Sequence, residues 1–224
     1  MTNVEPTTAR GEETRQRIVD SALRMFEEKG FEKTTMRAIA GDAGVSLGNA
    51  YYYFSSKEAL VQGFYQRLQL LHEEKAKTAL DGRSSLADRW LTMELAFLDV
   101  AEPFHQFAGK FFAIAAEPTS PLSPFSAESR QARQASTHIM RTVIDGSGAK
   151  GDKRLMAELP ELMWLGHMGV VLFWVHDRSP GQERTRLLVR RVAPLVERVV
   201  ALSRLRPLRP ALHQALDVLA ELST

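Results

Sequence analysis

Apolar residues recur at spacings of three and four along almost the whole chain, and this periodicity constrains the fold more than any other feature. Such spacing places side chains on one face of a helix. In the segment 182–205, the residues that share one face are Leu188, Val192, Leu195, Val199 and Leu202. The sequence has no run of alternating β-branched residues bounded by turn signals, which would indicate a strand. It therefore predicts an all-α protein.

Glycines and capping residues divide this pattern into short helices before about residue 54 and longer ones after it. Gly30 is a helix-stopping residue, and Thr35 and Ser46 can each cap a short helix. "SSKE" is a capping box that pairs Ser55 with Glu58 and opens a fourth helix. The inward residues expected on that fourth helix are Leu60, Phe64, Leu68 and Leu71. Further helices are expected at about 86–103, 104–116, 125–145, 155–177, 182–205 and 210–222, with Pro194 inside one of them.

Helix length rather than composition indicates the domain organisation. The expected parts are a flexible N-terminal tail over 1–11, a three-helix head over 12–56 and a larger helical domain over 57–224. The N-terminal segment lacks the apolar core of a secretory signal.

Composition excludes several classes of function. The chain of 224 residues contains no cysteine, which rules out disulfides and thiolate metal sites and favours a reducing cytoplasm. The apolar run Leu162–Val175 is too short to span a bilayer, so we expect no membrane association through it. A net charge of +2 gives no argument for nucleic acid by itself. Any case for DNA has to come from local arrangement.

The stretch "GVSLGNAYYYFSSKEAL" (44–60) supplies that arrangement. Two short helices joined by the tight turn "AGVS" are typical of a helix-turn-helix, whose second helix enters the major groove. Gly48 disfavours that helix by about 1 kcal/mol relative to alanine, a cost that close approach of DNA would explain. Successive residues are about 100° apart, so the three tyrosines cannot all point inward. The alternative is that the tyrosines are packing residues, and for Tyr53 inward packing is as well supported as DNA contact.

The segment 14–64 resembles the DNA-binding domain of the TetR (tetracycline repressor) family. The resemblance rests on the ordered pattern "A…F…GF…TT…IA…AGVS.G..Y.YF.SKE.L". Tyr53 departs from it where many members have histidine, and Ala50 where a larger residue is common. The resemblance implies DNA contacts from Thr35, Arg37, Ser46, Leu47, Gly48, Asn49, Tyr51, Tyr52 and Lys57. Of these, Leu47, Asn49 and Tyr51 are expected at base edges, and Thr35, Ser46, Tyr52 and Lys57 at the backbone.

The resemblance also implies an effector pocket among the middle helices. The candidates are Trp90, Met93, Phe97, Phe107, Phe111, His138, Trp164, His167 and Met168. An aromatic and methionine stripe is more often plain core, but this set has more polar-tipped side chains than packing needs.

The arginine-rich segment 184–209 has two interpretations. It could be a second nucleic-acid surface, but such a charge run more often flanks an apolar dimer seam. We favour the seam. The residues expected in it are Leu172, Leu188, Val192, Leu195, Val199 and Leu202.

The sequence offers little for a metal site or an enzyme. Glu102 and His105 have the spacing of one half of a di-iron site, but no second Glu-x-x-His exists. Neither a phosphate-binding glycine loop nor an HExxH motif is present. We therefore expect no cofactor and no catalysis.

The sequence thus predicts a cytoplasmic, homodimeric repressor of transcription that binds a palindromic DNA operator and is released by a small-molecule effector. The alternatives are a helical enzyme, or a small-molecule-binding module that kept the head without binding DNA.

Overall fold

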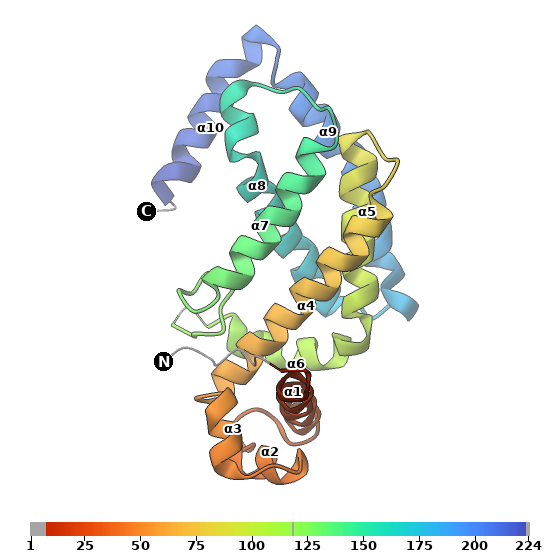
Figure 1. Cartoon of the computed structure of the whole chain (residues 1–224). Helices are drawn as coiled ribbons and strands as arrows, with labels where there is room; N and C mark the ends of the chain where they lie inside the picture. Colours follow the sequence, from red (N-terminus) through yellow and green to blue (C-terminus); the bar gives the residue numbers. More distant parts are fainter. Residues whose placement is uncertain (1–7, 118, 223–224) are drawn as a thin grey trace. The chain divides into compact units, whose positions relative to one another are not determined.

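The computed structural model describes residues 8–117 and 119–222, and within them the chain forms helices and no strand (Figure 1). The all-α class predicted from the apolar periodicity is confirmed. The helices are α1 (Ala9–Lys29), α2 (Met36–Asp42), α3 (Leu47–Tyr53), α4 (Lys57–Ala79), α5 (Leu86–Ala101), α6 (His105–Ala115), α7 (Arg130–Asp145), α8 (Lys153–His176), α9 (Glu183–Leu202) and α10 (Arg209–Leu222). Short 3₁₀ turns are η1 (Glu102–Phe104), η2 (Pro180–Gln182) and η3 (Arg206–Leu208).

Helices α2, α3 and α4 were each predicted to start at a capping side chain. Two of these three caps are found at the predicted residue, and the third is shifted by one position. Thr35 Oγ1 accepts a hydrogen bond from the backbone N–H of Ala38 at 3.2 Å. Ser46 Oγ accepts one from that of Asn49 at 3.1 Å, so both predicted caps are confirmed. The exception is α4, where Ser56 rather than Ser55 accepts from the N–H of Ala59, at 3.2 Å.

Helix α1 begins earlier than the sequence pattern suggested. Its first residue is Ala9, and Thr8 caps it by accepting from the N–H of Gly11 at 3.1 Å. The end of the tail expected over 1–11 is therefore helical, and residues 1–7 lie outside the described residues.

Helix α4 presents a different face to the interior than expected. Leu71, predicted to point inward, is 38% exposed, whereas the next residue, His72, is fully buried. His72 lies four and eight residues after Leu68 and Phe64, so it continues their stripe. Leu71 is about 100° away from His72 around the helix. The prediction for Leu71 was wrong by one residue.

The chain divides into two compact units. The first contains Met1–Leu70 and Pro103–Arg133, and the second contains Leu71–Glu102 and Gln134–Thr224. Helices α4 and α7 each contribute residues to both units.

The interior of the first unit is a phenylalanine core. It is formed by Phe26, Phe31, Phe64, Phe107 and Phe111, from α1, the loop after it, α4 and α6. Their ring centroids lie 5.0–6.5 Å apart in tilted, stacked and edge-to-face pairs. Such pairs add to the stabilisation that burial of the rings provides. The short helices of the head are therefore held by tertiary packing and not by their own helix propensity.

Gly63 on α4 permits close packing inside the same unit. A Cβ added at this position would come within 2.7 Å of the ring of Phe54, which is itself fully buried. Phe54 directly follows α3, so this contact seats the end of α3 against α4.

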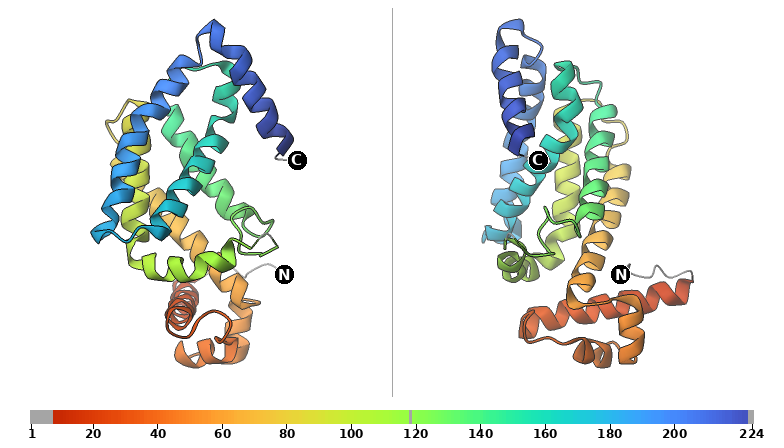
Figure 2. Two further views of the ribbon diagram at one scale, coloured as in Figure 1. Left: turned by 180° about the vertical axis from the view of Figure 1, so that it is seen from behind. Right: turned by 90° about the vertical axis from the view of Figure 1, so that its left-hand side faces the viewer.

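In the second unit, α5 lies along α9, and α8 packs against α9 (Figure 2). The three tryptophans of the chain, Trp90, Trp164 and Trp174, all belong to α5 and α8 and are buried. Both α8 and α9 contain an internal proline, at Pro160 and Pro194, without ending there.

A buried arginine joins two helix ends in this unit. The guanidinium of Arg89 donates to the carbonyls of Thr142 and Val143 in the last turn of α7, at 2.8 and 2.9 Å. It also donates to the carbonyls of Leu80 and Arg83 after α4, at 3.3 and 3.0 Å. Carbonyls at helix C-termini lack partners within the helix and attract positive charge, so Arg89 satisfies both ends at once.

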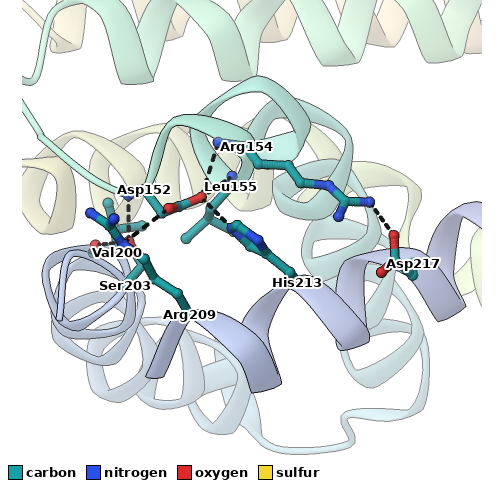
Figure 3. A network of polar contacts seen from close by, with 8 residues as sticks. All are labelled: Asp152, Arg154, Leu155, Val200, Ser203, Arg209, His213 and Asp217. Carbon is teal, nitrogen blue, oxygen red and sulfur yellow. Dashed lines mark hydrogen bonds and ion pairs between the residues drawn. The ribbon is translucent and has the colours of Figure 1, made fainter. Parts of the chain in front are cut away.

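Asp152 caps α8 and joins it to the end of α9 (Figure 3). Its carboxylate accepts from the backbone N–H groups of Arg154 and Leu155, at 3.0 and 3.4 Å. Its own N–H donates to Ser203 Oγ at 2.7 Å.

The same carboxylate holds α10 (Figure 3). His213 Nε2 lies 3.0 Å from Asp152 Oδ1, and Arg209 Nε lies 3.6 Å from Oδ2. The hydrogen bond from His213 is the main cause that lowers the pKa of Asp152. An ion pair between Arg154 and Asp217 adds a second link between α8 and α10. These polar contacts therefore attach the last helix to α8.

Candidate functional site

Helices α2 and α3 form the two arms of a helix-turn-helix in the first unit, in contact with each other. Gly44 in the turn has φ +66°, a left-handed conformation that residues with a Cβ rarely adopt. Val45 N–H donates to the carbonyl of Ala40 at 3.0 Å and closes the turn. The glycine therefore sets the sharp change of direction that brings α3 against α2.

Helix α3 has one buried and one exposed face. Ala50 and Tyr53 are buried against the head core. Tyr51 and Tyr52 are 49% and 58% exposed, and the ring of Tyr52 lies edge-on to that of Tyr53 at 5.1 Å. The expectation that the tyrosines divide between the two faces is confirmed, with Tyr53 as the inward one. Also exposed beside the two outer phenols are Ser46, Gly48 and Asn49, whereas Leu47 is half-buried.

Gly48 has no structural requirement inside the protein. A Cβ built at this position meets no atom within 4 Å, and its φ is not in the left-handed region. Alanine would therefore fit there and favour the helix more. The absence of a side chain leaves the backbone at the start of α3 open to an approaching molecule.

Two further candidates lie on or beside α2. Thr35 and Arg37 are both exposed at its first turn, and Thr35 uses its hydroxyl to cap the helix. On α2, Asp42 binds Arg24 of α1. Hydrogen bonds from Ser21 and Arg24 lower the pKa of Asp42. The guanidinium of Arg24 is therefore already paired with a carboxylate of the protein, that of Asp42.

Lys57 is half-buried and directed toward the head. Its Nζ donates to the carbonyl of Phe31 at 2.7 Å and lies 4.4 Å from the centroid of the Phe31 ring. An ammonium has three donors, so Lys57 can keep this bond and still offer a proton to a phosphate oxygen. The geometry makes Lys57 a brace between α4 and the loop after α1 before any contact with a ligand.

The residues predicted to form an effector pocket do not all come together. Those buried in the second unit are Trp90, Met93, Phe97, Trp164 and His167. Met168 is half-buried and His138 is exposed.

Phe107 and Phe111 lie instead in the phenylalanine core of the first unit. Helix α6 packs against α1, and this contact uses its aromatic face. Sequence spacing alone could not assign α6 to one unit or the other.

Three ionisable side chains lie together inside the second unit, and we term them the buried polar cluster: His72, Glu94 and His167. His167 was among the predicted pocket residues, whereas His72 and Glu94 were not. All three are fully buried. His167 Nδ1 lies 2.9 Å from Glu94 Oε2, and His72 Nε2 lies 3.0 Å from the carbonyl of Met93. The two imidazole rings are nearly parallel, with centroids 6.1 Å apart. A signal did exist, because Glu94 falls four residues after Trp90 on the apolar face of α5.

Apolar rings surround this cluster. Phe97 meets the ring of His167 edge-on at 4.5 Å and that of His72 at 5.4 Å. Trp174 lies 6.3 Å from Phe97. Burial, and then the proximity of His167, lowers the pKa of His72 to about 4. His72 is therefore neutral near pH 7.

The second unit exposes large apolar side chains on α8 and α9. Of the residues predicted for a dimer seam, Leu172, Leu195, Val199 and Leu202 are exposed and Leu188 and Val192 are half-buried. Sequence analysis did not include Leu165, Phe173 and Leu187, which are also exposed on these two helices. On α9, spacings of three and four place Leu188, Val192, Leu195, Val199 and Leu202 along one side of the helix.

Among the described residues, no three histidine, cysteine or carboxylate side chains are arranged to hold a metal ion. Glu102, considered above for a metal site, lies 3.7 Å from the guanidinium of Arg186. None of the described helices combines the length and apolarity needed to cross a membrane.

Two family models match the chain. Residues 18–63 match "Bacterial regulatory proteins, tetR family", and residues 89–220 match "Tetracyclin repressor-like, C-terminal domain". The first match contains α2, α3 and the start of α4, and the second covers more than half of the chain.

Curated relatives match about a third of the chain. The transcriptional regulator TtgR of Pseudomonas putida is 36% identical over 76 residues, which are 34% of this chain and 36% of that protein. The transcriptional repressor KstR2 of Rhodococcus jostii is 37% identical over 76 residues, 32% of this chain and 37% of that protein. The chain thus spans little more than a third of the length of these relatives.

Solved structures resemble the chain over most of its length. A putative TetR-family regulator from Syntrophomonas wolfei has a TM-score of 0.65 and 15% identity, covering 83% of this chain and 95% of that one. The fatty acid degradation regulator FadR of Bacillus halodurans has a TM-score of 0.62 and 15% identity, covering 84% and 96%. At this identity the likeness shows the fold alone. Together with the matched helix-turn-helix and the matched C-terminal domain, it establishes that this chain belongs to the TetR family of regulators.

Proposed function

We propose that this chain is a cytoplasmic repressor of transcription that binds a palindromic DNA duplex as a homodimer and leaves it when a small molecule binds. The exposed face of α3 carries this proposal. It presents hydrogen-bonding side chains and Gly48, a glycine that no contact inside the protein requires. The names of its relatives, a transcriptional regulator and a transcriptional repressor, support the same class of activity.

The residue types on α3 suit the two kinds of DNA contact. Side chains that present hydroxyl groups at a helix N-terminus and along its exposed face can donate to phosphate oxygens, which fixes position but carries no sequence information. We assign this role to the hydroxyl groups of Thr35, Ser46 and Tyr52 and to the ammonium group of Lys57.

Sequence reading requires side chains that reach base edges in the major groove. The amide of Asn49 can form two hydrogen bonds with adenine, and the aliphatic side chain of Leu47 can contact a thymine methyl. Tyr51 is the third member of this group, and Arg37 serves either role. Gly48 allows the backbone of α3 to come close to the duplex, since no Cβ stands between them.

Homodimer formation follows from the apolar side chains on α8 and α9. Exposed leucine, valine and phenylalanine on two adjacent helices form a surface that water disfavours. A second copy related by a two-fold axis would cover it with the same residues, and two-fold symmetry would present two α3 helices to two half-sites. The proposed seam contains Leu172, Leu188, Val192, Leu195, Val199 and Leu202.

Effector response would pass through α4. This helix begins at Lys57, four residues after α3 ends, and continues to Ala79, past His72 of the buried polar cluster. A ligand among the buried residues of the second unit would shift α4 if it bound one position of the helix better than another. The coupling between ligand and operator would be about 1–3 kcal/mol.

Selection from a random duplex library, followed by titration of the selected duplex at several salt concentrations, tests the proposal. A palindromic sequence should emerge, and log K should fall with log salt at about −0.9 per phosphate contacted. Absence of any enriched sequence, from protein that is folded and dimeric, would contradict the proposal and favour a binding module that kept the head.

Single substitutions test the assigned roles. Tyr52→Ala should weaken binding to all duplexes about equally, because it removes a backbone contact. Asn49→Ala should instead relax the preference at one base pair of each half-site. A uniform loss for both variants would contradict the assignment of Asn49 to a base edge.

A further inference from the structure

The buried polar cluster contains hydrogen-bonding atoms that the protein itself does not satisfy. Within the described residues, His72 Nδ1, Glu94 Oε1 and His167 Nε2 are all buried and have no hydrogen-bond partner. A buried polar atom without a partner has lost its hydrogen bonds to water without gaining others, which destabilises the folded protein. Three such atoms in side chains that contact one another are a large cost, and packing does not require it.

The polarity of two of these atoms can be assigned from their neighbours. The carbonyl of Met93 can only accept, so the N–H of His72 must be on Nε2, which faces it. Because His72 is neutral, its Nδ1 carries a lone pair and no proton. One proton lies between His167 Nδ1 and Glu94 Oε2, so Glu94 Oε1 also carries lone pairs only. The cluster therefore offers two acceptors, His72 Nδ1 and Glu94 Oε1, that have no donor from the protein.

The surroundings add a second property. The cluster lies against Phe97, with Trp90, Met93 and Trp174 buried on the same helices. Such neighbours favour a flat apolar molecule, and offset or edge-on ring contacts add to the burial of its surface.

From this combination we propose that the buried polar cluster recognises hydroxylated aromatic molecules, whose single O–H donates to Glu94 in a three-centre hydrogen bond shared with His72 while the ring packs against Phe97. This inference rests on the proposed function only in taking such a molecule as the effector. Each of α4, α5 and α8 supplies one of the three polar side chains, so a molecule bound there contacts all three helices. A ligand without the O–H would leave the buried acceptors unpaired. We therefore expect the donor to be required for tight binding.

The test compares two probes that differ by one hydrogen-bond donor. 4-Ethylphenol and 4-ethylanisole share the ring and the oxygen, but methylation removes the O–H. Calorimetric titration of the full-length protein should show the phenol binding roughly tenfold or more tightly, the factor expected when a buried acceptor stays unpaired. Equal affinity for the two probes, or binding of neither, would overturn the proposal.

Substitutions locate the preference. Glu94→Gln keeps the shape of the side chain but replaces the unpartnered acceptor with an amide donor, so the tenfold preference for the phenol should disappear. His72→Phe removes the other acceptor while keeping an aromatic ring, and should reduce the same preference. The matched control is Glu158→Gln, an exposed carboxylate on α8 that should leave both affinities unchanged. A preference that survives in Glu94→Gln and in His72→Phe, with both variants folded, would place recognition elsewhere.

Operator binding without any probe, measured on the same protein preparation, separates this inference from the proposed function. Protein that binds a selected duplex but does not distinguish the probes would overturn only the ligand assignment. Protein that distinguishes the two probes but enriches no duplex would support the ligand site and contradict the proposed function as a regulator of transcription.

Discussion

The two units of the molecule place polar and apolar groups in opposite ways. In the first unit, rings of phenylalanine fill the interior, and the hydrogen-bonding side chains of α3 face outward. In the second unit, two histidines and a glutamate lie in the interior, and leucines and valines of α8 and α9 face outward.

This difference separates residues that stabilise from residues that bind. Apolar groups inside and polar groups outside minimise free energy in water, so the interior of the first unit needs no other explanation. The second unit buries polar groups and exposes apolar ones, and each of these features lowers its stability. The proposed effector and the proposed second copy would compensate for these costs, inside and outside the unit.

Phe107→Ala should lower the free energy of unfolding of the first unit by roughly 3–5 kcal/mol, because it opens a cavity in the phenylalanine core. Urea titration followed by tyrosine fluorescence measures the loss. Phe125→Ala, at a ring that is 63% exposed in the same unit, should change stability by no more than about 0.5 kcal/mol. Unchanged stability in Phe107→Ala, together with a lost ligand response, would return Phe107 to the effector pocket.

Acid should destabilise the interior of the second unit through His72. Its pKa is lowered from 6.5 to about 4 in the folded protein, so the unfolded state takes up the proton first. The stability that comes from keeping His72 neutral is present above pH 6.5 and is lost as pH falls toward 4, by about 3 kcal/mol.

Urea titrations at several pH values, followed by tryptophan fluorescence, measure this slope. His72→Phe has no proton to take up and should show a flatter dependence over the same range. Equal slopes in the wild type and the variant would mean that burial of His72 is not a source of the acid sensitivity.

The exterior of the second unit is tested by Leu195→Asp. A carboxylate in the proposed seam would be buried without a partner, and the dimer should dissociate about 30-fold more readily, an effect of roughly 2 kcal/mol. Sedimentation velocity over a concentration series gives the dissociation constant. Leu70→Asp provides the comparison, since Leu70 is equally a leucine, is 67% exposed and lies outside α8 and α9. Should both variants remain as dimeric as the wild type, the seam lies on another surface.

The exterior of the first unit is tested by Gly48→Ala. The added methyl group has room and favours the helix, so stability should rise by up to about 1 kcal/mol while operator affinity falls. Gly41→Ala on α2 offers the matched control, because its Cβ would also meet open space. That variant should gain stability and keep operator affinity. A Gly48→Ala protein that binds the operator as well as the wild type would remove the proposed reason for this glycine.

Local chemistry explains why the head could be predicted closely. The caps at Thr35 and Ser46 and the turn at Gly44 depend on residues a few positions apart, and the structure has all of them where the sequence suggested. Ser55 was predicted as the cap of α4 because two adjacent serines both satisfy the local pattern. The backbone conformation makes Ser56 the cap instead.

The interior of the second unit depends on contacts between distant residues, which no local pattern reports. His167 meets Glu94 across 73 positions of sequence, and the sequence gives no hint that they are neighbours. His72 was overlooked because a leucine beside it satisfied the apolar spacing better. Phe107 and Phe111 were grouped with the tryptophans because α6 is apolar, although the side it buries lies in the other unit.

The aromatic residues also divide between the units by type. All four tyrosines, Tyr51, Tyr52, Tyr53 and Tyr65, belong to the first unit, and all three tryptophans belong to the second. The two units therefore carry different intrinsic fluorophores, so the fluorescence of the unlabelled protein can report on each unit. Tryptophan emission reports the second unit alone when it is excited at wavelengths that tyrosine does not absorb, and tyrosine emission arises in the first unit. If a ligand bound in the second unit alters the proposed DNA-binding face in the first, tryptophan emission should change before tyrosine emission, so the order of events can be timed without attaching a dye.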